Sequence, residues 1–242
     1  MYREYLATVE TLLEKLVASQ ENALEQAAAA LGDTLFEDGL IYIFGCGHSH
    51  MLAEEGFYRA GGLGAVCPIF QSDLMLHEGA VKSSALERRA DLAQEVLNRY
   101  PMTEKDCLIV FSNSGVNGLP VEMARLAKAQ GVKTIGVSSS AYWQEPSRHP
   151  LGLHLYEASH IAIDTGAPHG DSSYALQGMT GMMGPVSTVI GVFILNCLLG
   201  RAAEKCAARG KEPALYLSGN IAGGREKNED TIRRFRHRIR AM

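Results

Sequence analysis

The stretch LIYIFGCGHSH, residues 40–50, joins a continuous apolar run to a loop rich in glycine. An apolar run without polar alternation is typical of a strand covered on both faces, as in a parallel sheet. Helical periodicity precedes the stretch and recurs after it. Alternation of strands and helices predicts a doubly wound α/β fold. Further runs that read as strands lie at residues 65–70, 107–111, 132–137 and 160–164.

These elements predict a five-stranded parallel sheet, flanked by helices, in the flavodoxin-like order 2-1-3-4-5. The second strand contains Pro68, which favours a position at the sheet edge. We expect a single domain over residues 1–242, with an N-terminal helix in 1–34, a core in 35–200 and a helical tail in 201–242. Within these parts, helices are expected at residues 2–31, 83–99, 121–130 and 183–209.

Composition excludes several classes of partner. The net charge of −4 is mild and favours neither nucleic acid nor an anionic membrane surface. The most apolar stretch, residues 186–199, is shorter than the ~20 residues that span a bilayer. The N-terminus lacks the apolar region of a signal peptide. The five cysteines form no CxxC pair, which predicts a reduced, cytoplasmic location.

Two loops follow strands directly and carry the polar chemistry of the sequence. GCGHSH, residues 45–50, follows the first strand, and SNSGVN, residues 112–117, follows the third. Their glycines let backbone N–H groups approach a ligand, and each loop leads into a helix N-terminus that favours an anion. In the predicted order the first and third strands are neighbours, and ligands bind at this switch point. The two loops therefore predict one anion site.

Nucleotide-binding functions agree less well with the two loops. The 45–50 loop lacks the third glycine of GxGxxG, and Asp73 is the nearest acid for a ribose. No GxxxxGK[ST] loop is present. A dinucleotide-binding oxidoreductase stays open as an alternative, but a phosphate held by hydroxyl and N–H groups favours a sugar monophosphate.

Both loops resemble those of the SIS (sugar isomerase) domain, whose members carry GxGxS after the first strand and an SxSGx[TN]-like loop after the third. The resemblance covers about residues 35–200 and is greatest to single-domain bacterial members that resemble phosphosugar isomerases. Asn117 stands where threonine is commoner in the family. The resemblance implies a sugar-phosphate site that includes Gly47, His48, Ser49, Ser112, Asn113, Ser114, Asn117, Ser138 and Ser139. It also implies that Asn220 of the tail reaches into a site, as C-terminal segments do in some members.

The same resemblance implies isomerisation through an enediol, which needs a base and an acid that opens the sugar ring. Glu55, on the helix after Ser49, is the candidate base, and His169 is the candidate acid. Phosphoheptose isomerases carry their glutamate further along this helix, where Arg59 stands here. A non-catalytic sensor of a sugar phosphate is the alternative function.

The histidines and the long helices bear on metal binding and on assembly. His48 and His50 alternate in direction along the loop, which argues against a shared metal, so we predict no metal and no cofactor. The basic tail is typical of a solvated helix face. The long apolar helices near both ends of the chain favour a homodimer packed through helix faces.

Overall fold

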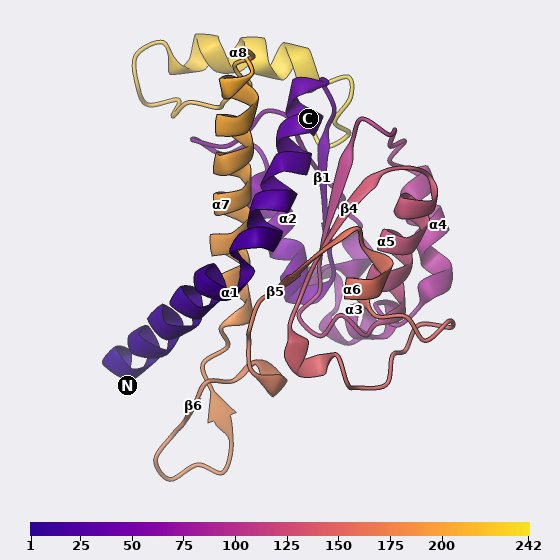
Figure 1. The fold of residues 1–242 in the computed structure, drawn as a ribbon, viewed down its shortest axis with the longest axis vertical. Coiled ribbons are helices and arrows are strands. Elements are labelled where there is room, and N and C mark those ends of the chain that lie inside the picture. The colour runs from indigo at the N-terminus through magenta and orange to yellow at the C-terminus, as the bar shows by residue number, and fades with distance from the viewer.

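The computed structural model describes residues 1–242, and a five-stranded sheet lies at its centre (Figure 1). Every neighbouring pair of strands is parallel, and the order β2-β1-β3-β4-β5 confirms the predicted topology. Pro68 lies in the edge strand β2, as expected for a residue that cannot donate a ladder hydrogen bond. The strands are β1 (Ile41–Gly45), β2 (Val66–Pro68), β3 (Cys107–Phe111), β4 (Lys133–Ser138) and β5 (Ile161–Asp164).

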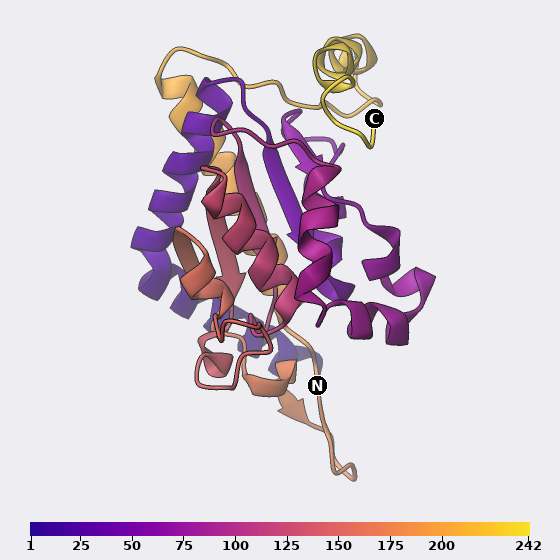
Figure 2. The same ribbon diagram turned by 90° about the vertical axis from the view of Figure 1, so that its right-hand side faces the viewer.

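Helices cover both faces of the sheet. On one face α1 packs along α7, and α2 lies between α7 and β1 (Figure 1). On the other face α5 packs between α4 and α6, which Figure 2 views from the front. These helices are α1 (Tyr2–Phe36), α2 (Met51–Gly56), α4 (Ala93–Asn98), α5 (Gly118–Ala129), α6 (Leu155–Ala158) and α7 (Ser187–Ala208).

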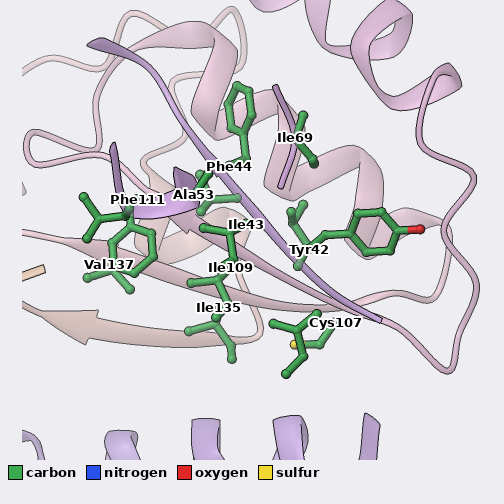
Figure 3. Close-up of a cluster of buried hydrophobic side chains, with 14 of the residues drawn as sticks. Tyr42, Ile43, Phe44, Ala53, Ile69, Cys107, Ile109, Phe111, Ile135 and Val137 are labelled. Carbon is green, nitrogen blue, oxygen red and sulfur yellow. The ribbon is translucent and has the colours of Figure 1, made fainter. Parts of the chain in front are cut away.

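The core explains why the strands read as continuous apolar runs. Every residue of β1 and β3 is buried, because helices cover both faces. Ile43, Ile109 and Ile135 are register partners on neighbouring strands, and their side chains lie in a row (Figure 3). They belong to one cluster of 50 buried hydrophobic residues that extends into α1, α5 and α7.

The segment expected as one helix over residues 83–99 is broken, and this prediction was wrong. It forms α3 (Ala80–Leu86), a turn and then α4, with a single 3₁₀ turn at Ala90–Leu92 between them. The break packs against the start of α5. A Cβ on Gly118 would lie 2.7 Å from the carbonyl oxygen of Arg88, so only glycine permits this approach. Tertiary packing therefore overrides the helical period.

Two features at the periphery extend the architecture. A hairpin of β6 (Tyr174–Ala175) and β7 (Met182–Met183) projects from the body, and α8 (Gly224–Phe235) crosses the opposite end (Figure 1). No helix here is both long enough and apolar enough to cross a lipid bilayer. The remaining 3₁₀ turns are η1 (Gly47–His50), η2 (Ser72–Leu74), η3 (Leu76–Glu78), η5 (Ser140–Tyr142) and η6 (His169–Asp171).

Candidate functional site

A narrow cleft lies at the carboxyl ends of β1, β3, β4 and β5. This is the edge where ligands bind in open α/β sheets, at the switch in strand order. The start of α7 closes one side of it. The lining residues are Ser49, Leu52, Phe111, Ser112, Asn113, Val137, Thr165, Ser187, Thr188 and Gly191. Residues from both predicted loops thus meet in one cleft.

The 45–50 loop turns tightly as it leaves β1. A Cβ on Gly45 would lie 2.4 Å from the carbonyl oxygen of Ser49, so the backbone requires glycine there. Gly47 has a φ of +56°, which also favours glycine. This turn places half-buried Ser49 at the cleft, whereas His48 is exposed and is not part of the lining.

The 112–117 loop presents backbone N–H groups that have no partner in the protein. The N–H of Gly115 donates to Oγ of Ser112 at 3.3 Å. The backbone N–H groups of Asn113, Ser114, Val116 and Asn117 have no acceptor in the protein. Buried backbone donors are nearly always paired, so a run of free ones marks a place for an acceptor. Converging N–H groups at the start of a helix form an anion-binding concavity.

The start of α5 has no side-chain cap. Asn117 occupies the N-cap position, yet its side chain bonds no N–H of the helix. Instead, its Nδ2 donates to Oε1 of Glu87, and its Oδ1 accepts from Nη1 of Arg148, both at 2.8 Å. Burial raises the pKa of the half-buried Glu87 carboxyl. In the first turn of α5 the N–H of Leu119 donates to the backbone carbonyl of Glu87 at 3.0 Å, so the free donors near the positive end of the α5 dipole are those of the preceding loop.

The start of α7 is occupied, in contrast. Oδ1 of Asp171 accepts the N–H groups of Val186 and Ser187, at 3.0 and 2.8 Å. Asp171 adopts a φ of +50°, which is unusual for a residue other than glycine. Its carboxylate already meets the dipole of α7. An anion in the cleft is therefore better placed at the 112–117 loop than at α7.

The lining carries hydroxyl and amide groups but no charged side chain. Oδ1 of Asn113 is buried and has no hydrogen-bond partner, so it can accept from a ligand hydroxyl. Thr165, Ser187 and Thr188 add hydroxyls that sequence reasoning missed. Their places in the sequence could have indicated them: Thr165 directly follows β5, and Ser187 and Thr188 begin α7. Such a lining suits a polyhydroxylated anion.

Ser138 and Ser139 are buried and lie behind the cleft. A Cβ on Gly115, whose φ is +63°, would lie 2.9 Å from Cβ of Ser138. The N–H of Ser139 donates to the carbonyl of Asn113 at 2.8 Å, and its hydroxyl donates to the carbonyl of Ala167. The two serines hold neighbouring loops together, and neither belongs to the lining.

Gly47, Ser114 and Asn117 lie on the two loops but are not part of the lining, and the remaining predicted residues lie away from it. Glu55 bonds Arg59 and accepts from Nδ2 of Asn196 on α7 at 3.4 Å. His169 is exposed and stacks on Tyr142, with ring centroids 4.6 Å apart. Asn220 is exposed and shortly precedes α8, and α8 lies at the end of the sheet where the strands begin (Figure 1). Their functional roles stay predictions.

No group of three or more His, Cys, Asp or Glu side chains comes together to hold a metal ion. His50 is buried beside Phe70, with ring centroids 5.5 Å apart, and its Nε2 has no partner. Burial lowers the pKa of His50, which favours the neutral ring. His50 therefore packs beneath the loop, whereas His48 faces solvent.

Residues 140–154, here called the 140–154 segment, are fastened to α5 by a buried histidine. Nε2 of His149 lies 2.8 Å from Oε2 of Glu122, and the His149 side chain is only 2% exposed. The hydrogen bond from Arg125, with that from His149, lowers the pKa of Glu122 below its ordinary value of 4.5. A lowered carboxyl pKa stabilises the fold above the ordinary value, and this contribution is lost as pH falls through the folded value.

Glu122→Gln is therefore expected to lower the free energy of unfolding near neutral pH, by an amount that shrinks below a pH of about 4.5. Urea denaturation of both proteins between about pH 3 and 7 measures this difference. A difference that stays constant over that range would show that the charge of Glu122 contributes nothing.

Comparisons with known proteins agree with the geometry of the cleft. A family model described as "SIS domain" matches residues 4–139. The UPF0309 protein of Halalkalibacterium halodurans is 42% identical over 240 residues, which cover 99% of this chain and 96% of the relative. The UPF0309 protein of Thermoanaerobacter pseudethanolicus is 39% identical over 247 residues and is matched over the whole of both chains.

Solved structures share the fold at low sequence identity. The phosphoheptose isomerase of Neisseria gonorrhoeae has a TM-score of 0.53 and 13% identity, over 82% of this chain and 95% of that one. The phosphoheptose isomerase of Francisella tularensis has a TM-score of 0.53 and 15% identity, over 84% of this chain and 96% of that one. With the two loops at the switch point of the sheet, these matches confirm the resemblance that the loop motifs indicated. The chain belongs to the SIS domain family and, within it, to the UPF0309 proteins.

Proposed function

We propose that this protein binds a phosphorylated sugar in the cleft and interconverts its aldose and ketose forms. The observation that carries the proposal is the set of unpaired N–H groups in the 112–117 loop. The phosphate lies on this loop, where the free donors and the dipole of α5 stabilise its charge. Ser112 and Ser114 lie on this loop, and Ser49 faces it from the loop after β1.

The sugar occupies the part of the cleft between β1, β5 and α7. Hydroxyl groups of Thr165, Ser187 and Thr188 surround it, and Oδ1 of Asn113 accepts from one of its hydroxyls. Leu52 and Phe111 supply apolar surface for the carbon skeleton. An uncharged lining of this kind selects hydroxyl groups, and the loop selects the phosphate.

The isomerase reaction is supported by the phosphoheptose isomerases that share the fold. Isomerisation moves a proton between neighbouring carbons, so a side chain must take it from one and return it to the other. Glu55 is the predicted base, and His169 the predicted ring-opening acid. In the free protein Glu55 bonds Arg59 and Asn196, so it has to turn toward the cleft to act.

The test is proton exchange in D₂O, followed by NMR, with aldose and ketose phosphates of five to seven carbons. Wild-type protein is expected to incorporate deuterium at C1 or C2 and to form the paired isomer. Glu55→Gln is expected to abolish both while sugar-phosphate binding persists, because the amide cannot accept the proton. Unchanged turnover would remove Glu55 as the base. Binding without turnover in the wild type would favour the sensor.

The proposal also covers the oligomeric state and the location of the protein in the cell. The protein forms a homodimer through its projecting α1 and hairpin, whose exposed apolar side chains include Tyr2, Leu6 and Met182. It acts in the cytoplasm, where its five cysteines, all unpaired in the structure, stay reduced.

A further inference from the structure

Arg148 lies at the open end of the 112–117 loop, tied to it by both backbone and side chain. Its N–H donates to the carbonyl of Val116 at 2.8 Å, and Nη1 donates to Oδ1 of Asn117 at 2.8 Å. Val116 and Asn117 are two of the residues whose own N–H groups are free. The guanidinium therefore lies beside a loop whose own N–H donors are unpaired.

The charge of Arg148 is available to a ligand. The side chain is exposed, and its one hydrogen bond is to the neutral amide of Asn117. A guanidinium has five N–H donors in a planar fork, so one bond to Asn117 leaves the others free. The lining of the cleft has no charge of its own, so this cation is placed to balance an anion on the loop.

The backbone of Arg148 is held in place by its neighbours in the chain. The adjacent His149 is buried and bonded to Glu122 of α5, which fixes the 140–154 segment over the start of that helix. The hydroxyl of Ser147 donates to the carbonyl of Leu153 at 2.5 Å and closes the segment on itself. A positioned guanidinium loses less conformational entropy when it binds than one on a mobile loop.

We propose that Arg148 is the specificity-determining residue for a doubly charged phosphate monoester on the 112–117 loop. The inference rests on the proposed function and deepens it, because it names the charge that the site requires. The free N–H groups of Asn113, Ser114, Val116 and Asn117 donate to the inner oxygens of the phosphate. Arg148 bonds an outer oxygen and neutralises one charge, so a neutral sugar or a singly charged ester binds more weakly.

The carboxylate of Glu87 is expected to oppose phosphate binding at the same site. Its Oε1 accepts from Nδ2 of Asn117, so Asn117 separates the carboxylate from the guanidinium. An ionised Glu87 repels a phosphate and competes for the charge of Arg148. Removing the charge of Glu87 therefore has the opposite effect on phosphate affinity from removing that of Arg148.

The experiment titrates inorganic phosphate and a panel of sugar phosphates into the full-length protein at pH 8 by calorimetry. Arg148→Gln is expected to weaken phosphate binding by about 10- to 100-fold, the range of a charge-assisted hydrogen bond. The phosphate affinity of Arg148→Lys is expected to lie between those of the wild type and Arg148→Gln, because lysine keeps the positive charge but lacks the planar set of N–H donors. Glu87→Gln is expected to tighten binding severalfold. Arg236→Gln, which removes an exposed cation after α8, is the control.

The outcomes separate the inference from the proposed function. Each variant is first compared with the wild type by thermal unfolding without ligand, which excludes a folding defect. Equal phosphate affinities for the wild type and Arg148→Gln, in a wild type that binds phosphate, would overturn the role of Arg148 alone. A wild type that binds neither phosphate nor any sugar phosphate would overturn the proposed function, and this inference with it.

Discussion

Replacing Ser114 with aspartate is expected to weaken sugar-phosphate binding by at least about 100-fold, or about 2.7 kcal/mol. Ser114 is half-buried in the loop whose N–H groups are unpaired. A carboxylate there satisfies those donors from within the protein and repels the incoming phosphate. Like charges brought together in a binding site cost several kcal/mol. The new carboxylate also lies before α5, where a negative charge stabilises a helix, so folding is expected to persist.

The control for this variant is Ser114→Asn, which has nearly the same shape as aspartate and no charge. Calorimetric titration with the same sugar phosphate compares the two. We expect the asparagine variant to keep most of the affinity. Equal losses in both variants would mean that size, and not charge, governs the loop, and the anion site would have to lie elsewhere.

Gly45→Ala is expected to lower the free energy of unfolding by about 3 kcal/mol, since overpacking a rigid site typically costs 1–3 kcal/mol and sometimes more. The added Cβ would lie 2.4 Å from the carbonyl oxygen and 2.5 Å from the carbonyl carbon of Ser49. Both atoms are backbone, so relief requires the 45–50 loop to move. Ser49 then leaves the cleft, and ligand affinity falls together with stability.

Urea denaturation measures the loss, with Gly200→Ala as the matched control. Gly200 lies within α7, and a Cβ there meets nothing within 4 Å. Alanine is favoured over glycine in a helix, so this control is expected to gain about 0.5–1 kcal/mol. A Gly45→Ala protein as stable as the wild type would contradict the close approach of the 45–50 loop to β1.

The sheet could be predicted because burial on both faces leaves a direct trace in the sequence. Residues 107–111 are apolar without interruption, and every one is buried. The helix over 83–99 could not be predicted correctly, because its break depends on Gly118 of a different helix. Local periodicity contains no record of that contact. The β6–β7 hairpin was missed for a different reason, because strands of two residues are too short to leave a pattern.

The candidate site was predicted in part, for a similar physical reason. Loops that follow neighbouring parallel strands must meet, so Ser49 and Ser112 could be placed together from the strand order alone. Arg148 comes 31 residues after Asn117, and its contact depends on how the 140–154 segment folds back over α5. Glu55 was chosen by its distance from Ser49 along a helix, whereas the structure turns it toward α7.

The most direct test of the central claim is thermal unfolding in the presence of sugar phosphates, the matching free sugars, NAD and NADP. A ligand at about 100 times its dissociation constant adds about 2.7 kcal/mol to the free energy of unfolding. We predict such stabilisation by one or more sugar phosphates, none by the matching free sugars, and its loss in Ser114→Asp. Stabilisation by NAD alone, or by nothing in the panel, would contradict a phosphate site on the 112–117 loop.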